Sequence, residues 1–348
     1  MFKKDTKYLI AYLAPLAAFA GIYYAGIWSL GAMYVGFVLI PILEIFAKGT
    51  QENFSTPVEA TKKEDRFFDV LLYLNLPILY ALIVAYLLRI EAGGLSSFEI
   101  LGMTLSVGLV VGTVGINVAH ELGHRTTWYE QLMAKSLLLS ALYMHFFIEH
   151  NRGHHKNVAT EKDPATSRQG EAIYFFWIRS VFGSYWSAWK LEHRRLTKMG
   201  RSALSWSNEM LRFQAIQLCY LFGMGLVFGW DKIPYLIGVA VTGFLLLESV
   251  NYIEHYGLRR KLLENGRYET VKPQHSWNSN KEFGRIFLYE LTRHSDHHFK
   301  ASRKYQVLRH FDESPQLPYG YPTSMLIALI PPLWFKLMDK ELQGLQAA

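Results

Sequence analysis

Long apolar segments constrain this chain more than any other feature of its sequence. A helix needs about 20 mostly apolar residues to cross the hydrocarbon core of a membrane. Six segments reach or approach this length, and they occupy residues 8–28, 30–47, 67–88, 98–119, 211–230 and 233–250. Only 19% of the 348 residues are charged, against about 25% in soluble domains. The sequence therefore predicts an all-α integral membrane protein, with a six-helix transmembrane bundle in a single membrane domain spanning residues 1–348.

Basic residues predict how these segments are oriented, because cytoplasmic loops carry an excess of lysine and arginine. Lys3 and Lys4 precede the first segment, which we interpret as a retained anchor. The loop between the second and third segments carries Lys48, Lys62, Lys63 and Arg66. With six crossings, the two long polar stretches, at about 120–209 and 254–321, are then expected to form a cytoplasmic, histidine-rich helical cap.

Histidine residues indicate where the chemistry of the chain lies. Nine of the 13 histidines fall into four short motifs on the predicted cytoplasmic side. They are His120 and His124 in HELGH, His150, His154 and His155 in EHNRGHH, His255 in NYIEHYG, and His294, His297 and His298 in RHSDHH. The remaining four, expected to be ordinary core or surface residues, are His145, His193, His275 and His310. Clustered imidazoles repel one another when protonated, whereas bound metal keeps them neutral, so the motifs predict a metal site.

The spacing within the motifs predicts which histidines share a helix face. Residues three or four apart lie on one face of a helix. The pairs with this spacing are His120/His124, His150/His154 and His294/His297. The adjacent residues His155 and His298 point about 100° away and could reach a second ion. The motifs therefore predict room for two metals.

The number and type of ligands favour iron. Imidazole binds zinc, copper, iron and nickel. HELGH has the spacing of a zinc peptidase motif, but zinc enzymes normally use three protein ligands, and nine histidines exceed that number. The only cysteine, Cys219, lies within an apolar segment, so a thiolate-based site is excluded. Two redox-active iron ions sharing nine nitrogens are the favoured interpretation, with a membrane zinc peptidase as a distant alternative.

Four acidic residues adjoin the histidines in sequence and are expected to orient them from neighbouring segments. They are Glu121, Glu149, Glu254 and Asp296. Neighbours on a helix point in different directions, so each acid is expected to serve a ligand from another motif. No side chain is assigned as a catalytic acid or base.

The four histidine motifs, in this order and at these intervals, resemble those of the membrane-bound alkane 1-monooxygenases. The similarity extends through DPATSRQGE (163–171), WSNEML (206–211), KPQHSWNSN (272–280) and KYQVLRHF (304–311), and it covers about residues 8–340. Membrane fatty acid desaturases and xylene monooxygenases share the histidine framework. NYIEHYG together with HSWNSN favours the alkane hydroxylases within that class.

The resemblance implies a non-haem diiron enzyme of the bacterial inner membrane, with its active site on the cytoplasmic side and the nine clustered histidines as iron ligands. It implies terminal hydroxylation of n-alkanes by O₂, with electrons from NADH through rubredoxin reductase and rubredoxin. Side-chain hydroxylation of an alkylbenzene or desaturation of an acyl chain is the alternative. In this family a bulky side chain in the second membrane helix limits alkane length, and Gly36 at the matching position implies a long channel.

The residues themselves also indicate a separate electron donor. One cysteine cannot supply the four thiolates of a rubredoxin iron site, and we find no nucleotide-binding fingerprint. The net charge of +7 suits an acidic electron-transfer protein or an anionic lipid surface equally well. No nucleic-acid partner is expected.

Overall fold

The computed structural model describes residues 5–47 and 49–347. Lys3, Lys4 and Lys48, which entered the topology prediction, lie outside the described residues. Within those two ranges the regular structure is helical, and β-structure is limited to two isolated bridges, Leu262 with Tyr268 and Asn278 with Gln316. The prediction of an all-α chain is confirmed.

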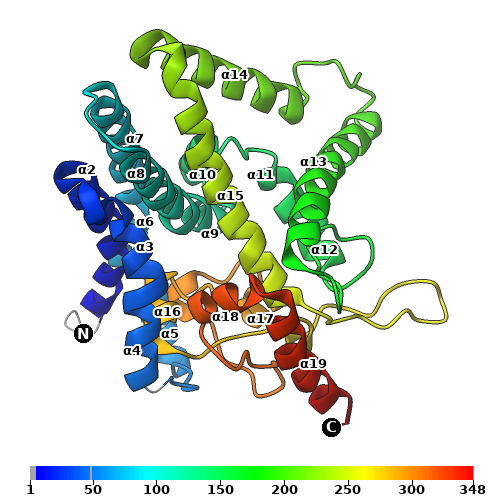
Figure 1. Ribbon diagram of the computed structural model, residues 1–348. Helices are drawn as coiled ribbons and strands as arrows, with labels where there is room; N and C mark the ends of the chain where they lie inside the picture. Colours follow the sequence, from blue (N-terminus) through cyan, green and yellow to red (C-terminus); the bar gives the residue numbers. More distant parts are fainter. Residues whose placement is uncertain (1–4, 48, 348) are drawn as a thin grey trace. The chain divides into compact units, whose positions relative to one another are not determined.

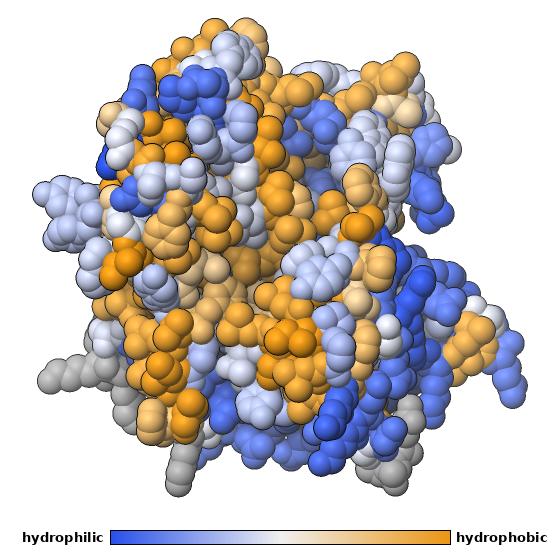
Figure 2. Space-filling view, viewed as in Figure 1, coloured by the Kyte–Doolittle hydropathy of each residue, from blue (hydrophilic) through white to orange (hydrophobic). Residues whose placement is uncertain are grey.

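Six helices are long and apolar enough to cross a membrane. They are Thr6–Tyr24, Gly26–Phe46, Arg66–Glu91, Ser97–Gly123, Glu209–Phe228 and Trp230–His255. Each overlaps one of the six predicted segments. Figure 2 shows hydrophobic residues over much of the surface in this view. In the fifth helix, Leu218, Phe222, Leu226 and Val227 are 57–72% exposed. Such a surface fits the helices of a multi-pass membrane protein, because hydrocarbon solvates apolar side chains that water does not.

The chain divides into two compact units. Unit 1 comprises Met1–Leu39, Arg66–Ile148 and Ala188–Leu247, and unit 2 comprises Ile40–Asp65, Glu149–Ser187 and Glu248–Ala348. Two long helices, α13 (Ile173–Lys198) and α15 (Ile233–His255), contribute residues to both units. The single membrane domain and its cytoplasmic cap remain predictions.

Unit 1 is a bundle of apolar helices. Besides parts of α13 and α15 it contains α2 (Leu13–Tyr24), α3 (Gly31–Tyr34), α6 (Arg66–Tyr73), α7 (Asn75–Glu91), α8 (Ser97–Val110), α9 (Asn117–Gly123), α10 (Trp128–Ser140) and α14 (Glu209–Phe228). Helices α7 and α8 lie side by side (Figure 1). A capping box of Ser96 and Glu99 begins α8, because each side chain satisfies a backbone N–H that the first helical turn leaves free. Further along α8, Gly108 allows close packing against Thr242 of α15.

Unit 2 consists of shorter helices joined by long loops. Besides parts of α13 and α15 it contains α4 (Ile40–Phe46), α5 (Thr56–Glu64), α12 (His155–Asn157), α16 (Glu282–Phe287), α17 (His294–Phe299), α18 (Tyr321–Ala328) and α19 (Pro331–Ala347), and α11 (Phe146–Glu149) ends in it. Helices α16 and α18 pack against α4. There the backbone N–H of Gly284 donates to the buried carboxylate of Glu44 (3.1 Å). Side chain-to-backbone contacts of this kind hold loops that have few helical hydrogen bonds of their own.

Helix α13 buries one face that mixes polar residues with Phe176, Ala188 and Leu196, and it exposes large apolar residues on the opposite face. Ser180, Ser184 and Glu192 are 9% exposed or less, and they lie along one side of the helix. The opposite side carries large exposed apolar residues, namely Phe175 (71%), Ile178 (61%), Phe182 (63%) and Trp186 (60%). The sequence prediction placed this segment in a cytoplasmic cap and did not identify the apolar stripe.

Candidate metal centre

Four histidines of unit 2 converge in one buried group, which we call the four-histidine group: His154, His255, His294 and His298. One ring nitrogen from each lies within 4.8 Å of those of the others. The Nε2 atom of His298 lies 2.8 Å from Nε2 of His294 and 3.2 Å from Nε2 of His154. All four side chains are nearly inaccessible to solvent. The geometry therefore brings lone pairs of several rings into one small, dry space.

The segment 275–280 explains how the chain brings these rings together. The backbone N–H of Trp277 donates to the carbonyl of Glu254 (2.8 Å), next to His255 at the end of α15. One residue later, the side-chain oxygen of Asn278 accepts from the backbone N–H of Ser295 in α17 (2.8 Å). This segment thus ties the end of α15 to the helix that carries the RHSDHH motif. The HSWNSN motif therefore holds His255 and the histidines of the RHSDHH motif close together.

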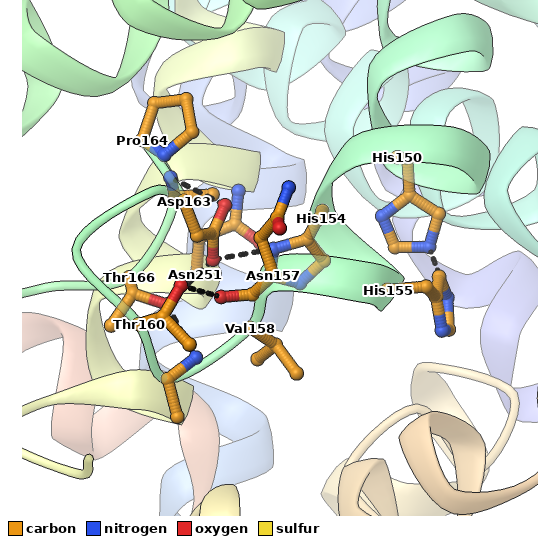
Figure 3. A network of polar contacts seen from close by, with 12 residues as sticks. His150, His154, His155, Asn157, Val158, Thr160, Asp163, Pro164, Thr166 and Asn251 are labelled. Atoms are coloured by element: carbon orange, nitrogen blue, oxygen red, sulfur yellow. Dashed lines mark hydrogen bonds and ion pairs between the residues drawn. The ribbon is translucent and has the colours of Figure 1, made fainter. Parts of the chain in front are cut away.

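Asp163 fixes the orientation of His154. Its Oδ2 lies 2.9 Å from Nδ1 of His154, and its Oδ1 accepts from the backbone N–H of Ala165 (3.1 Å). The hydroxyl of Thr166 also donates to this carboxylate (Figure 3). Because Nδ1 is engaged by the carboxylate, Nε2 is the nitrogen left to face the four-histidine group. This is how carboxylates orient the histidine ligands of metals.

Sequence reasoning missed this role of Asp163. The residue opens the DPATSRQGE motif, but it is nine positions from His154, so nothing in the histidine motif pointed to it. The pKa of His154 reflects two opposed effects: burial would lower it, but the nearby charge of Asp163 and their hydrogen bond raise it above its usual value. The pKa of Asp163 is correspondingly lowered despite its burial.

A second group in unit 2, the three-histidine group, consists of His150, His155 and His297. The Nε2 atom of His155 lies 3.0 Å from Nε2 of His150 and 3.0 Å from Nε2 of His297. Residues 150–154 form a π-helical turn in which the N–H of His155 donates to the carbonyl of His150. The wider turn brings residues five apart onto one face. Figure 3 shows the rings of His150 and His155 approaching each other.

The predicted pairs do lie close together, with ring centroids 5.2 Å apart for His150 and His154 and 5.5 Å apart for His294 and His297, but each pair is divided between the two groups. His150 and His154 belong to different groups, as do His294 and His297. The π turn explains the first case, because it replaces the expected i, i+4 relation with an i, i+5 relation. In α17 the i, i+4 neighbour His298, rather than His297, accompanies His294. The expectation that neighbouring histidines in a motif diverge holds, since His154/His155 and His297/His298 separate in this way.

His120 and His124 belong to unit 1. His120 lies in the last turn of α9 and His124 caps that helix. Their ring centroids are 5.3 Å apart, and the ring planes are nearly perpendicular. A π-helical turn at Val111–Ile116 precedes α9. The spacing of HELGH thus brings its two histidines close together, as predicted from their separation of four residues.

The four acidic neighbours of the histidines have different partners. Glu254 Oε2 lies 3.1 Å from Nε2 of His294, so this carboxylate adjoins the four-histidine group directly. Asp296 accepts instead from the backbone N–H of Arg309 (2.7 Å) and from Arg303 (3.0 Å).

The other two acids also have polar partners outside the histidine motifs. Glu149 accepts from the hydroxyl of Ser187 (3.2 Å). Burial raises the pKa of Glu149 to about 8. Glu121 forms an ion pair with Arg125, whose Nη2 lies 2.7 Å from Oε1 of Glu121. An orienting role for either carboxylate remains a prediction.

The residues of the four-histidine group fit a bound metal ion. The Nε2 atom of His255 is buried and has no hydrogen-bond partner among the described residues. Burial and the neighbouring imidazoles hold the pKa of His298 well below its usual value, which disfavours its protonated form. An uncompensated buried polar atom costs about 1–3 kcal/mol, and a coordinated cation would remove that cost. The four donors are all imidazole nitrogens, which suit iron, copper, zinc and nickel.

The position predicted to line a substrate channel is closely packed. A Cβ atom added to Gly36 would lie 2.9 Å from Cδ1 of Leu109. The side chain of Leu109 therefore fills the space beside Gly36 into which a larger side chain would project. A long channel at this point remains a prediction.

Comparison with known proteins places the chain in a family. Residues 97–326 match the family model described as fatty acid desaturase. Alkane 1-monooxygenase 2 of Pseudomonas aeruginosa is 41% identical over 350 residues, covering 95% of this chain and 91% of that protein. The alkane 1-monooxygenase of Ectopseudomonas oleovorans is 40% identical over 348 residues, covering 97% of this chain and 86% of that protein.

A relative with a different name is less similar. The xylene/toluene monooxygenase hydroxylase component XylM of Pseudomonas putida is 30% identical over 336 residues, covering 94% of this chain and 87% of that protein. The resemblance inferred from the histidine motifs is thereby confirmed over almost the whole chain. This chain belongs to the alkane 1-monooxygenase family, within the wider family of fatty acid desaturases.

Proposed function

We propose that this protein hydroxylates the terminal methyl group of n-alkanes to primary alcohols, using O₂ and two non-haem iron ions. The observation that carries the proposal is the arrangement of seven histidines of unit 2 in two adjoining groups. About 40% identity to alkane 1-monooxygenases supports the choice of substrate. Per turnover, O₂, two electrons and two protons convert the methyl group to an alcohol and release one water.

The ligands of the two ions follow from the two groups. The four-histidine group would hold one iron. The three-histidine group would hold the other, completed by His120 and His124 of unit 1, which are the histidines of the remaining motif. When bound, the irons supply the redox chemistry that activates O₂, which no side chain of the chain can provide.

The protein's own residues position and shield this centre. Asp163 holds Nδ1 of His154 so that Nε2 faces the site. Glu254 lies at Nε2 of His294, where a carboxylate can act as a further oxygen donor or orient the ring. The nearly complete burial of the four-histidine group excludes bulk water, which protects reactive species from side reactions.

Substrate and electrons are proposed to arrive from different sides. An n-alkane partitions into lipid, so it would enter between the apolar helices of unit 1 and present its methyl end to the histidines. Electrons would come from NADH through rubredoxin reductase and rubredoxin, because the lone Cys219 cannot form a rubredoxin-type iron site. We place the protein in the bacterial inner membrane, with the histidine groups in a cytoplasmic cap.

A second candidate function is side-chain hydroxylation of an alkylbenzene. The 30% identity to the xylene/toluene monooxygenase component is the observation that keeps it open. The higher identity to alkane 1-monooxygenases favours n-alkanes. Acyl-chain desaturation has only the family model in its favour.

Metal and product analysis of the same preparation would test the proposal. The purified protein in lipid nanodiscs is assayed for iron and zinc by mass spectrometry. It is then supplied with rubredoxin, rubredoxin reductase and NADH, and with octane, hexadecane or xylene in separate reactions. We expect about two irons per chain and 1-alkanols as products.

A matched pair of variants makes the result specific. His154→Ala removes a buried residue of the four-histidine group and should abolish the alcohol product, whereas His193→Ala changes an exposed histidine outside both groups and should not. One zinc per chain with no alcohol would contradict the proposal. Benzylic alcohol from xylene, with none from the alkanes, would establish the second candidate instead.

A further inference from the structure

The apolar stripe of α13 is an exposed apolar surface outside the six candidate membrane spans. Phe175, Ile178, Phe182 and Trp186 recur at intervals of three or four residues, so they share one helix face. That face is exposed, and the opposite, buried face carries Phe176, Ala188 and Leu196 beside two serines and a glutamate. An exposed apolar helix face is favourable in the boundary between headgroups and acyl chains.

The end of this helix and the loop after it are strongly basic. Residues 188–212 contain six lysines and arginines and two glutamates, a net charge of +4 out of +7 for the whole chain. The loop also exposes Leu204 (85%) and Trp206 (72%), directly before α14 begins at Glu209. Tryptophan beside the end of a membrane span is typical of the interface. Charge and exposed apolar side chains therefore occur together at one end of a candidate span.

A pocket of about 410 Å³ lies within this part of unit 1. Its lining includes Arg195, Arg201, Trp206, Glu209 and Arg212. The arginines differ in how far their hydrogen-bond donors are used. The guanidinium of Arg195 is engaged, because it donates to both carboxylate oxygens of Glu192 (2.8 and 2.6 Å) and to the carbonyl of Ser207 (2.7 Å).

Two arginines of the pocket keep donors available. Among the described residues, Arg201 donates through Nη1 to the hydroxyl of Ser207. Arg212 forms an ion pair with Glu209 at 3.7 Å, longer than a hydrogen bond, and its buried Nε has no hydrogen-bond partner among the described residues. Lys135 lies 3.0 Å from the same glutamate and neutralises it. Three cationic side chains, Arg201, Arg212 and Lys135, thus lie near a single carboxylate, so positive charge is in excess at the pocket.

We propose that this pocket binds the phosphate of an anionic phospholipid headgroup. Arg201 and Arg212 contact the phosphate, and Leu204 and Trp206 insert beside its acyl chains. The unused guanidinium donors match the oxygens of a phosphodiester, which arginine binds with strong charge-assisted hydrogen bonds. The exposed apolar residues next to them match the hydrocarbon that a free phosphate lacks. Basic pockets on the cytoplasmic side of membrane helices bind acidic headgroups in this way.

Lipid binding in detergent solution tests the pocket directly. The full-length protein is titrated with short-chain phosphatidylglycerol, with phosphatidylcholine or with inorganic phosphate, and bound lipid is followed by native mass spectrometry. Wild type should retain phosphatidylglycerol in preference to the other two. The double variant Arg201→Gln/Arg212→Gln should bind it at least tenfold more weakly, since one charge-assisted hydrogen bond alone accounts for about that factor.

The control variant is Arg194→Gln/Lys198→Gln. It removes the same charge from exposed residues at the end of α13 that do not line the pocket, and it should bind phosphatidylglycerol as wild type does. Equal weakening in both variants, or none in either, would overturn the proposal. So would equal binding of phosphatidylcholine, or binding of inorganic phosphate as tight as that of the lipid.

A label in the loop tests its position even if the double variant fails to fold. Because Cys219 is the only cysteine, Cys219→Ser/Leu204→Cys carries a single environment-sensitive dye. In nanodiscs containing phosphatidylglycerol, lipid-attached bromine should quench the dye and aqueous iodide should not. Quenching by iodide alone would overturn the proposal, as would protection of the dye by added rubredoxin rather than by lipid.

Discussion

The two histidine groups of this protein differ in whether unit 2 supplies all of their proposed metal ligands. Every member of the four-histidine group comes from unit 2, whose segment 275–280 and Asp163 loop hold the rings in place. The three-histidine group has only His150, His155 and His297 in that unit. On our proposal it needs two more ligands from the helix that ends in HELGH. On our proposal one site therefore takes all its ligands from unit 2, and the other takes them from two parts of the chain.

This difference predicts unequal metal affinities. The four-histidine group is already crowded and dry, so a metal ion entering it gains ligands without further ordering of the chain. On our proposal the other group takes two of its five ligands from the separate HELGH segment, and holding a segment distant in sequence in place costs conformational entropy. We therefore expect the four-histidine group to fill first and to lose its ion last.

The largest effect is expected for His255→Ala. This change removes a fully buried histidine that we propose as a ligand of the four-histidine group, so iron should fall from about two to one or fewer per chain. Alkane hydroxylation should become undetectable. Iron analysis together with product analysis checks this. A variant with two irons and normal turnover would remove His255 from the ligand set.

A contrasting result is expected for His124→Ala in unit 1. If the three-histidine group is completed by HELGH, this variant should lose hydroxylation and one iron but keep the iron of the four-histidine group. Iron titration of the variant should then show one remaining site with wild-type affinity. Loss of both ions would show that the two sites do not fill independently.

A smaller effect is expected for Asp163→Asn. The carboxylate that holds His154 is replaced by a neutral amide of the same shape, and loss of such an orienting group typically lowers metal affinity about 10–100-fold. Competition with a chelator measures the change. Glu161→Gln, an exposed substitution in the same loop, is the control. Asp163→Asn with unchanged metal retention would mean that packing alone orients His154.

The smallest effect is expected from mild acid on the metal-free protein. Burial and neighbouring imidazoles depress the pKa of His298, so the folded protein does not take up the proton that the unfolded chain accepts below about pH 6.5. Stability should therefore fall as pH decreases below that value, by at most about 1.4 kcal/mol per pH unit for this residue. Thermal unfolding at pH 7.0 and 5.5 measures it. A His298→Gln variant should show a shallower pH dependence, and an equal or steeper one would contradict this assignment.

Much of the fold was predictable from the sequence because apolar length alone identifies membrane helices. The nine histidines were predictable as candidate ligands because they are clustered in the sequence. Their division into two groups was not predictable, because the spacing of the histidines does not reveal the π turn at residues 150–154. Asp163 acts across a loop whose path the sequence does not reveal. The apolar stripe of α13 was different, because Phe175, Ile178, Phe182 and Trp186 show helical spacing in the sequence. Four basic residues at 190–198 follow them, so the apolar pattern is confined to the first part of the segment.

The central claim is that histidines from separate motifs surround two iron ions, one of them held entirely by unit 2. Anomalous X-ray scattering at the iron absorption edge, from crystals of the iron-loaded protein, locates each ion directly. We predict two peaks, one contacted by Nε2 atoms of the four-histidine group and the other by His150, His155 and His297 together with His120 and His124. A single peak, or two peaks away from these nitrogens, would contradict the account.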